Sequence, residues 1–548
     1  MPALSLVSAV VLAALETLKL FSSSISSSFR PFTMDCGNTH IVVTDLTVSF
    51  CPPADAMAAC ALDSQKWHRI EKELYLHTAQ QSAWLHVAQS EEKEMTADDL
   101  VVEDIRIGEL CPNSGSDESW ESRAGGIWVL RRRYDRRSHR TVTAVDVLFG
   151  MDAVDPRPQW SIIRPPLQLN AQPDVPVAML SIDRGTVKPR PVSPQATLRV
   201  GEDGKFKIVQ ISDTHMVTGV GVCKDAIDRD GRALPESEAD PLTINFLSGI
   251  LDVEKPDLVI LTGDQLHHDI PDSQSALFKV VAPLIERSIP YAAVFGNHDA
   301  EGTHALSRPE EVDGVGNYYL QIFDHAHSQL PLSTLYFLDS HGQIQSKVKD
   351  PDYDWIKQSQ IDWFTRTSQA LKMTREKNDS NDRFHLSLAF MHIPLPEYGD
   401  SNLIEKGGQR REPTEGPSFN SHFYNALIKE GISAMSCGHD HVNDFCALRP
   451  DHMHGESQQY ALKLPRLGPW LCYGGGSGFG GYCSYDGKRY HRRSRVWELD
   501  TNNGSIKTWK RVEYTDERVD ELVLVKGGEV AADSHEVDGL MDARTRSC

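Results

Sequence analysis

The chain has 548 residues, of which 40% are hydrophobic, so it is long enough for more than one globular domain and for at least one large core. Its formal net charge of -21 at pH 7 argues against nonspecific binding to nucleic acid or to an anionic membrane, because both depend on a basic protein surface. We therefore expect no nucleic-acid partner.

Residues 1–33 form an apolar and serine-rich leader. Its apolar run, Ala3–Leu15, has the texture of a secretory signal core, but no basic residue precedes it, and Glu16 and Lys19 interrupt its continuation. We expect membrane contact only through this run. The pattern slightly favours a cytoplasmic protein and leaves a secretory or membrane-anchored protein as the alternative.

Residues 34–195 contain short strand-like runs separated by prolines, such as Val142–Phe149. They predict a β-rich accessory domain that is smaller than the part that follows. The ten cysteines of the chain show no C-x-x-C spacing, and no disulfide framework can be deduced from them. We expect Cys437 and Cys446 to be reduced and to act as small hydrophobic residues.

Residues 196–515 alternate between short apolar runs, typical of buried strands, and amphipathic stretches, which indicates an α/β domain. The expected strands are 206–211, 257–262, 291–295 and 386–391, and the expected helices are 242–253, 275–287, 355–374 and 419–430. Residues 516–548 are predicted to be an acidic tail with partial disorder.

A polar cluster follows each apolar strand of this domain, at the place where α/β sheets bind ligands. Seven side chains in these clusters offer oxygen or imidazole donors, which is enough for two adjacent metal ions: Asp213, His215, Asp264, Asn297, His392, His439 and His441. Two cations held close together need a negative group between them, and Asp264 is the predicted bridge. Glycines before Asp264, Asn297 and His439 would allow tight turns there.

Two other features admit two interpretations each. The glycine-rich stretch Tyr473–Tyr482 either lets backbone amides approach a phosphate or forms a flexible or tightly packed turn, and we favour the turn. Three nearby arginines could contact an anionic substrate or form a solvated basic face: Arg492, Arg493 and Arg495.

The ordered motifs Asp213-Thr-His215, Gly263-Asp264, Gly296-Asn-His-Asp299, His392 and Gly438-His-Asp-His441 resemble the calcineurin-like metallophosphoesterase superfamily. The resemblance covers about residues 200–510 and implies a two-layered β-sandwich flanked by helices. The N-terminal part is similar to that of the fungal dosage-dependent cell-cycle regulator phosphatases. The catalytic part is also similar to purple-acid-phosphatase-like proteins that lack the metal-binding tyrosine.

The resemblance implies a role for each site residue. Asp213, His215 and His441 would bind the first metal, and Asn297, His392 and His439 the second, with Asp264 shared. His298 would stabilise or protonate the phosphate, and Asp299 would orient its ring. At the position of the purple acid phosphatase tyrosine this chain has His267, so no tyrosinate colour is expected, and the metals stay open between Mn, Zn, Fe and Mg.

Two classes of function follow. The first is a dinuclear phosphatase that hydrolyses phosphate monoesters, with phosphoproteins as candidate substrates, by in-line attack of a metal-bound hydroxide; a phosphodiesterase on the same centre is its enzymatic alternative. The second is a scaffold that binds a partner without turnover. The complete set of candidate ligands favours the enzyme.

Overall fold

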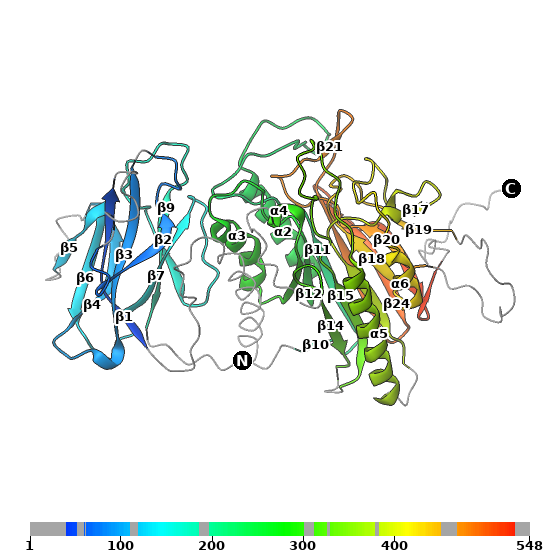
Figure 1. Ribbon diagram of the computed structural model, residues 1–548, viewed down its shortest axis with the longest axis horizontal. Coiled ribbons are helices and arrows are strands. Elements are labelled where there is room, and N and C mark those ends of the chain that lie inside the picture. The colour runs from blue at the N-terminus through cyan, green and yellow to red at the C-terminus, as the bar shows by residue number, and fades with distance from the viewer. Residues whose placement is uncertain are drawn as a thin grey trace, which may run out of the picture.

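The computed structural model describes residues 40–51, 60, 62–79, 81–109, 119–185, 197–300, 312–325, 329–378, 383–450 and 468–531. They form a β-rich part before residue 186 and a larger part built on two sheets after residue 196, which lie next to each other (Figure 1). Among these residues, no helix combines the length and the apolar content needed to cross a membrane. The leader lies outside the described residues.

The accessory domain contains three antiparallel sheets of three strands each. Their orders are β1-β3-β2, β4-β6-β5 and β7-β9-β8. The strands are β1 (Ile41–Cys51), β2 (Trp67–Glu73), β3 (Ser82–Glu91), β4 (Leu100–Ile107), β5 (Trp120–Ser122), β6 (Ile127–Arg133), β7 (Val142–Phe149), β8 (Trp160–Ile163) and β9 (Ala178–Arg184). Alternate side chains of these strands point into one shared core, which includes Leu46, Leu85, Val129, Val147 and Leu180. The prediction of a β-rich accessory domain is confirmed.

The larger domain is a sandwich of an eight-stranded and a seven-stranded sheet. In spatial order, the first comprises β10 (Leu198–Arg199), β14 (Tyr318–Phe323), β15 (Pro331–Phe337), β16 (Leu386–Phe390), β18 (Ala434–Cys437), β20 (Trp470–Tyr473), β19 (Cys446–Leu448) and β17 (Ile404–Lys406). The second comprises β13 (Tyr291–Val294), β12 (Leu258–Thr262), β11 (Lys205–Ile211), β23 (Arg493–Asp500), β24 (Ser505–Val512), β25 (Val519–Lys526) and β26 (Glu529–Val530). A small hairpin, β21 (Ser484–Tyr485) and β22 (Lys488–Arg489), projects from one end (Figure 1).

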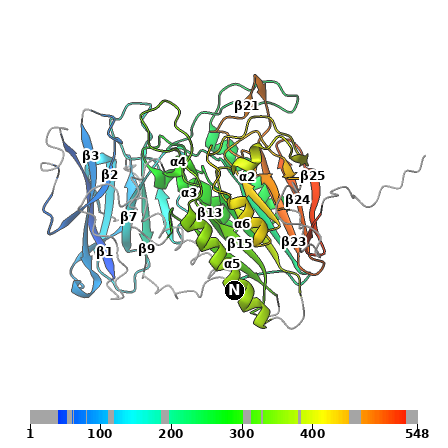
Figure 2. The ribbon, with the colours of Figure 1, turned by 45° about the vertical axis from the view of Figure 1, so that its right-hand side comes forward.

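Apolar side chains of both sheets form the core of the sandwich, and helices cover its outer faces. Phe206 and Trp497 of one sheet and Leu335 and Phe390 of the other lie in the central core. Helices α2 (Ala239–Glu254) and α3 (Ser273–Glu286) cover the seven-stranded sheet, while α5 (Gln358–Asn378) and α6 (Phe423–Lys429) cover the eight-stranded sheet (Figure 2). The structure confirms the two-layered sandwich flanked by helices.

Three local predictions need correction. Helix α5 begins at Gln358, after an irregular segment, and α6 covers only Phe423–Lys429 of the stretch expected to be helical. The predicted acidic tail contributes β25 and β26 to the seven-stranded sheet, because Leu522 and Val525 pack into the central core. Residues 532–548 lie outside the described residues.

Cys446 forms a disulfide with Cys472, and Cys51 forms one with Cys60. The prediction of a reduced Cys446 is therefore wrong: antiparallel pairing of β19 with β20 places Cys446 directly opposite Cys472. Cys437, the other cysteine expected to be reduced, is a buried free thiol among the described residues.

Candidate metal centre

The polar clusters of the sequence meet at one end of the sandwich. Strands β11, β12 and β13 are parallel to one another, as are β16 and β18 in the opposite sheet, so the loops after them gather at the same end. The segment after β11 runs alongside the segment after β12. Asp213 N–H donates to Gly263 O, and His215 N–H donates to Asp264 O. The predicted site residues are thus held by backbone hydrogen bonds between neighbouring loops.

Several of these residues have an unusual backbone conformation. Asp213, His215, Asp264 and His439 have φ values of 56°, 48°, 50° and 73°, in the left-handed region that residues other than glycine rarely adopt. Such conformations cluster at functional sites, where the surrounding fold enforces them. The three loops that carry them, after β11, β12 and β18, are therefore held in unfavourable backbone conformations that direct their side chains into the site.

Glycines make the close approach of these loops possible. A Cβ atom on Gly296 would lie 2.0 Å from Oδ1 of Asp264, and one on Gly438 would lie 1.9 Å from Oγ of Ser212. Any side chain at either position would displace the neighbouring loop. The tight turns predicted before Asn297 and His439 are present.

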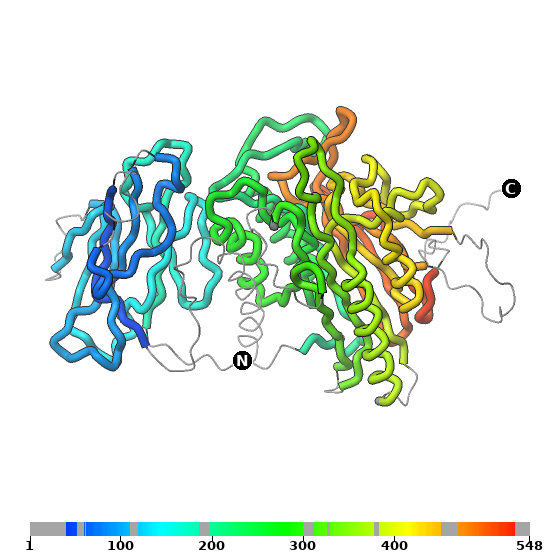
Figure 3. The backbone as a smooth tube through the Cα atoms, viewed as in Figure 1, coloured from blue at the N-terminus to red at the C-terminus, as the bar shows by residue number. Residues whose placement is uncertain are grey.

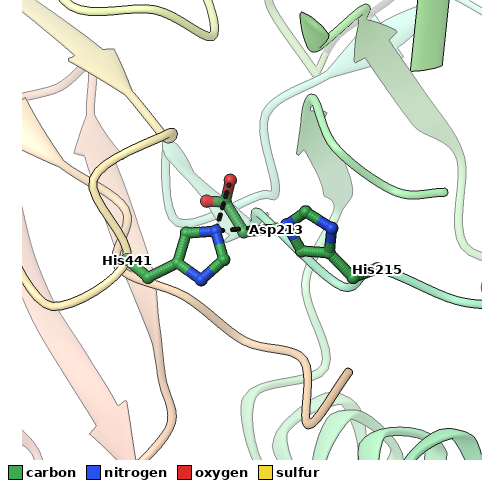
Figure 4. Close-up of side chains that lie close together, drawn as sticks. All are labelled: Asp213, His215 and His441. Atoms are coloured by element: carbon green, nitrogen blue, oxygen red, sulfur yellow. Dashed lines mark hydrogen bonds and ion pairs between the residues drawn. The ribbon is translucent and has the colours of Figure 1, made fainter. Parts of the chain in front are cut away.

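A first group consists of Asp213, His215 and His441, whose potential ligand atoms all lie within 4.8 Å of one another. Nε2 of His441 lies 3.5 Å from Oδ1 of Asp213 and 3.1 Å from Nε2 of His215, and Figure 4 shows the three side chains pointing toward one another. Nδ1 of His441 donates to Tyr482 O at 2.8 Å, which fixes the ring and leaves Nε2 for the site.

A second group consists of Asp264, His392 and His439, again with all potential ligand atoms within 4.8 Å. Nε2 of His392 lies 3.4 Å from Oδ2 of Asp264, 3.1 Å from Oδ1 of Asn297 and 3.3 Å from Nδ1 of His439. Nδ1 of His392 donates to Thr262 O at 2.8 Å, so Nε2 faces the group. All seven predicted ligand residues are therefore brought together.

Burial sets the charge of the histidines. It lowers the pKa of His441 to about 3 and holds the pKa values of His215 and His439 well below their usual range, so these rings are neutral at pH 7. Burial also lowers the pKa of His392, but the carboxylates of Asp264 and Asp213 outweigh that effect and raise it to about 10. Neutral imidazole is the form that binds metals, and a cation would compete with the proton of His392 for the same carboxylates.

His298 lies at the rim of the site. Its backbone N–H donates to Oδ1 of Asp264 at 2.9 Å, its Nε2 lies 3.7 Å from Oδ2 of the same residue, and 28% of its side chain is exposed. Asp299 accepts hydrogen bonds from Leu266 N and Gly296 N, both at 2.9 Å. These contacts give Asp299 a role in holding the loop backbone, whereas its predicted role in orienting the His298 ring stays a prediction.

His267 stands three positions after Asp264, where the resemblance to purple acid phosphatases predicts a tyrosine. Its ring centroid lies 5.9 Å from that of His215 and 6.4 Å from that of His298, beside the first group. The His268 ring lies next to it, with a centroid distance of 4.2 Å and the ring planes tilted by 32°. Burial and then the neighbouring His268 lower the pKa of His267 to about 4, so it presents a neutral ring to the site.

Sequence reasoning missed Tyr482, whose ring stacks on His441 with centroids 4.0 Å apart and planes at 11°. It ends the glycine-rich stretch, which is tightly packed: a Cβ on Gly481 would lie 2.5 Å from Cε1 of His441, and one on Gly478 2.0 Å from Thr214 O. The favoured interpretation as a packed turn holds, and this turn forms one wall of the site.

Neither interpretation of the three nearby arginines is correct, because all three are buried: Arg492, Arg493 and Arg495. The guanidinium of Arg492 donates to Lys224 O and Gly481 O. Arg493 contacts Asp444, and Arg495 donates to Tyr473 O and Asp444 O. These side chains therefore hold neighbouring segments of the larger domain together.

Comparisons with known proteins agree with this geometry. Residues 206–443 match the family described as calcineurin-like phosphoesterase. The phosphatase DCR2 of Saccharomyces cerevisiae is 36% identical over 405 residues, which cover 68% of this chain and 64% of DCR2, so the match spans less than two thirds of that protein. The expected likeness to fungal regulator phosphatases is confirmed.

A plant protein named probable inactive purple acid phosphatase 29, from Arabidopsis thaliana, is 37% identical over 357 residues, covering 58% of this chain and 84% of the plant protein. The solved structure of a dimetal phosphatase from Danio rerio is 12% identical, with a TM-score of 0.36, and covers 59% of this chain and 99% of that chain. From its sequence relatives and from the matched domain, this chain belongs to the calcineurin-like phosphoesterase family.

Proposed function

We propose that this chain is a dinuclear metal-dependent phosphatase that hydrolyses phosphate monoesters. The observation that carries the proposal is the position of Asp264. Its Oδ2 lies 3.8 Å from Nε2 of His215 in the first group and 3.4 Å from Nε2 of His392 in the second. One carboxylate thus adjoins both groups, as a bridge between two cations must.

The donors fit two such ions. Imidazole nitrogens, carboxylates and one amide oxygen suit zinc, manganese or iron. In the second group, Nδ1 of His439 lies 3.3 Å from Nε2 of His392, which in turn lies 3.4 Å from Oδ2 of Asp264. Two imidazole nitrogens that face each other beside a carboxylate form a donor set that fits a cation.

Metal ions bound there would activate a water molecule for attack on phosphorus and offset charge on the phosphate oxygens. The chain itself would orient the substrate. His298 is carried by the turn whose backbone N–H binds Asp264, so its ring is placed at the rim beside the bridge. From there it can donate to a phosphate oxygen or to the leaving group.

The name of the plant relative includes the word inactive, so the first point to test is whether this chain hydrolyses a phosphate ester at all. In this chain all seven ligand candidates and His298 converge on one buried site. That convergence supports an active enzyme over a scaffold.

The test is hydrolysis of p-nitrophenyl phosphate and of its bis-ester by purified protein, stripped of metal and then reconstituted with Mn²⁺, Zn²⁺ or Fe²⁺. We expect metal-dependent turnover of the monoester that Asp264→Asn abolishes. The matched control is Asp252→Asn, an exposed position on α2 that pairs with Arg287 and should leave turnover intact. A preference for the bis-ester would indicate a phosphodiesterase, and no turnover despite bound metal would indicate a scaffold.

Phosphoproteins are the substrate class that we propose to test next. A panel of phosphoserine, phosphothreonine and phosphotyrosine peptides, compared with p-nitrophenyl phosphate at equal concentration, would measure it. Peptide turnover that depends on the same metals and is lost in Asp264→Asn would support the proposal. Turnover restricted to small esters would contradict it.

A further inference from the structure

The accessory domain contacts the larger domain at helix α3. Strands β7 and β9 lie beside α3 in both ribbon views (Figures 1 and 2), and Figure 3 shows the same proximity in the backbone. Leu148 and Met179 of the accessory domain pack on Phe278 of α3 in a separate apolar cluster. Phe149 N donates to Oγ of Ser275 at 2.8 Å. The contact is thus both apolar and hydrogen-bonded.

Lys279 lies at the centre of this contact, and its side chain is fully buried. Its Nζ contacts Asp152 of the accessory domain at 2.8 Å and Asp240 of α2 at 2.5 Å, and it donates to Gly219 O at 2.5 Å. A buried ammonium needs such partners, because an unpaired charge in this position is strongly unfavourable. One cation therefore joins the accessory domain, α2 and the loop that contains Gly219.

That loop directly follows a predicted metal ligand. Residues 217–220, which we name the anchor segment, begin two positions after His215. Val217 N donates to Oδ2 of Asp240 at 3.1 Å, and Asp240 N donates to Val220 O at 2.9 Å. The carboxylate held by Lys279 thus also holds the anchor segment.

The accessory domain also reaches the anchor segment by two other routes. Nζ of Lys72 lies 3.4 Å from Oδ1 of Asp272, whose backbone N–H donates to Oγ1 of Thr218 at 3.0 Å. Gly150 packs against Gly219 so closely that a Cβ on Gly150 would lie 3.0 Å from Cα of Gly219. Both routes lead from an accessory residue to the anchor segment.

We propose that the accessory domain is a structural part of the metal centre, because it fixes the anchor segment and thereby the position of His215. Asp152 and Lys279 are positioning residues in this view: they do not touch a metal, and they act through Asp240 and the anchor segment. The inference rests on the proposed dinuclear function. It assigns the accessory domain a role in holding the first metal, whereas Asn297, His392 and His439, which complete the second group, come from other loops.

The experiment measures Co²⁺ binding by visible absorption in two backgrounds that each retain one group of ligands. His392→Ala removes a ligand of the second group, and His441→Ala removes one of the first. Into each background we would introduce Asp152→Asn, which removes the charge from the Lys279 contact with little change in shape. We expect Co²⁺ affinity to fall on the order of tenfold in the His392→Ala background, as for groups that orient metal ligands, and to stay unchanged in the His441→Ala background.

Two further variants separate positioning from loss of stability. Asp45→Asn makes the same chemical change in the accessory domain, where Asp45 pairs with Arg123 at 2.9 Å, and it should leave Co²⁺ affinity unchanged in both backgrounds. Asp152→Glu retains the charge and should recover part of the lost affinity. Thermal unfolding of each variant would verify that the protein remains folded at the temperature of the titration.

Equal Co²⁺ affinity with and without Asp152→Asn in the His392→Ala background would overturn the proposal. Equal weakening in both backgrounds would also overturn it, since that is the result of general destabilisation. Failure of the proposed function has a different signature: the unmutated protein would then bind fewer than two Co²⁺ ions.

Discussion

Nε2 of His215 and Nε2 of His441 face each other at 3.1 Å in the first group. Burial lowers the pKa of both rings, to about 3 for His441, so at neutral pH neither carries the charge that would bind it strongly to Asp213. Two neutral nitrogens at this distance either share one proton or flank a cation. The adjacent carboxylate of Asp213 favours the cation.

Gly481→Ala should disrupt this arrangement. The added Cβ would lie 2.5 Å from Cε1 of His441 and 2.8 Å from Cδ2 of His215, so one or both rings must move. We expect Co²⁺ affinity at the first group to fall at least tenfold, in line with the loss of ligand orientation, while the second group is retained. Gly249→Ala in α2 is the matched control, because a Cβ there meets no atom within 4 Å. Unchanged Co²⁺ affinity in Gly481→Ala would contradict this prediction, because it would show that the loop moves to accommodate the added Cβ.

The site could be predicted from sequence because its ligands follow strands. Asp213 and His215 follow β11, Asp264 follows β12, and His392 follows β16; the carboxyl ends of parallel strands meet at one edge, so linear order implies proximity. Apolar runs of the same strands predicted an α/β domain, whereas the two-layered sandwich was implied by the resemblance to the superfamily. The pattern of apolar residues therefore contained the positions of the strands and of most of the site, but not the layering of the sheets.

The features that the sequence did not predict depend on contacts between residues that are far apart in the chain, and such contacts leave no local sequence pattern. Cys446 and Cys472 are 26 residues apart and meet only because β19 pairs with β20. Arg495 looks exposed in sequence, yet β23 lies between β11 and β24, and its guanidinium is buried against Tyr473 O. Tyr482 reaches His441 by a turn whose course no spacing rule predicts.

His298→Asn tests the role of the rim histidine. If the ring donates to the phosphate or the leaving group, kcat should fall by about 10²- to 10⁴-fold, while bound metal and KM change little. Steady-state kinetics with p-nitrophenyl phosphate and metal analysis of the purified variant would measure this. His325→Asn, at a half-exposed position that pairs with Asp324, is the control and should keep full activity. A large loss of bound metal in His298→Asn would instead indicate a ligand role.

His267→Tyr tests why this chain is expected to lack tyrosinate colour. The His267 ring lies beside His215, so a phenolate at this position could reach an ion in the first group. With ferric iron, we expect the unmutated protein to show no tyrosinate absorption in the visible range and His267→Tyr to gain it. His268→Tyr, at the exposed neighbouring position, should stay colourless. Visible colour in the iron-loaded unmutated protein would contradict the expectation.

A buried network of ion pairs around Asp444 supports the site, and Asp444→Asn tests its contribution to stability. Asp444 contacts Arg493 at 2.6 Å, Lys510 at 2.8 Å and Arg411 at 2.5 Å, and its side chain is 2% exposed. Burial raises the pKa of Asp444, but Arg493 and the other two cations outweigh it and hold the pKa well below its usual range. Removing this charge would take the carboxylate partner from Arg493 and Arg411, while Lys510 would keep Asp520. We expect a loss of about 3–5 kcal/mol of unfolding free energy at pH 7.

The stabilisation that Asp444 contributes should decrease as the pH falls. Because the folded-state pKa of Asp444 lies below the unfolded value of about 3.9, its stabilisation is complete above that pH and declines as pH falls through the lower range. The difference in unfolding free energy between the unmutated protein and Asp444→Asn should therefore be constant from about pH 7 to pH 5 and shrink below about pH 4. Urea denaturation across this range would measure it, with Asp252→Asn as an exposed control whose removal should change stability little. A difference that grew on acidification would mean that Asp444 is not held as a carboxylate by its three cations.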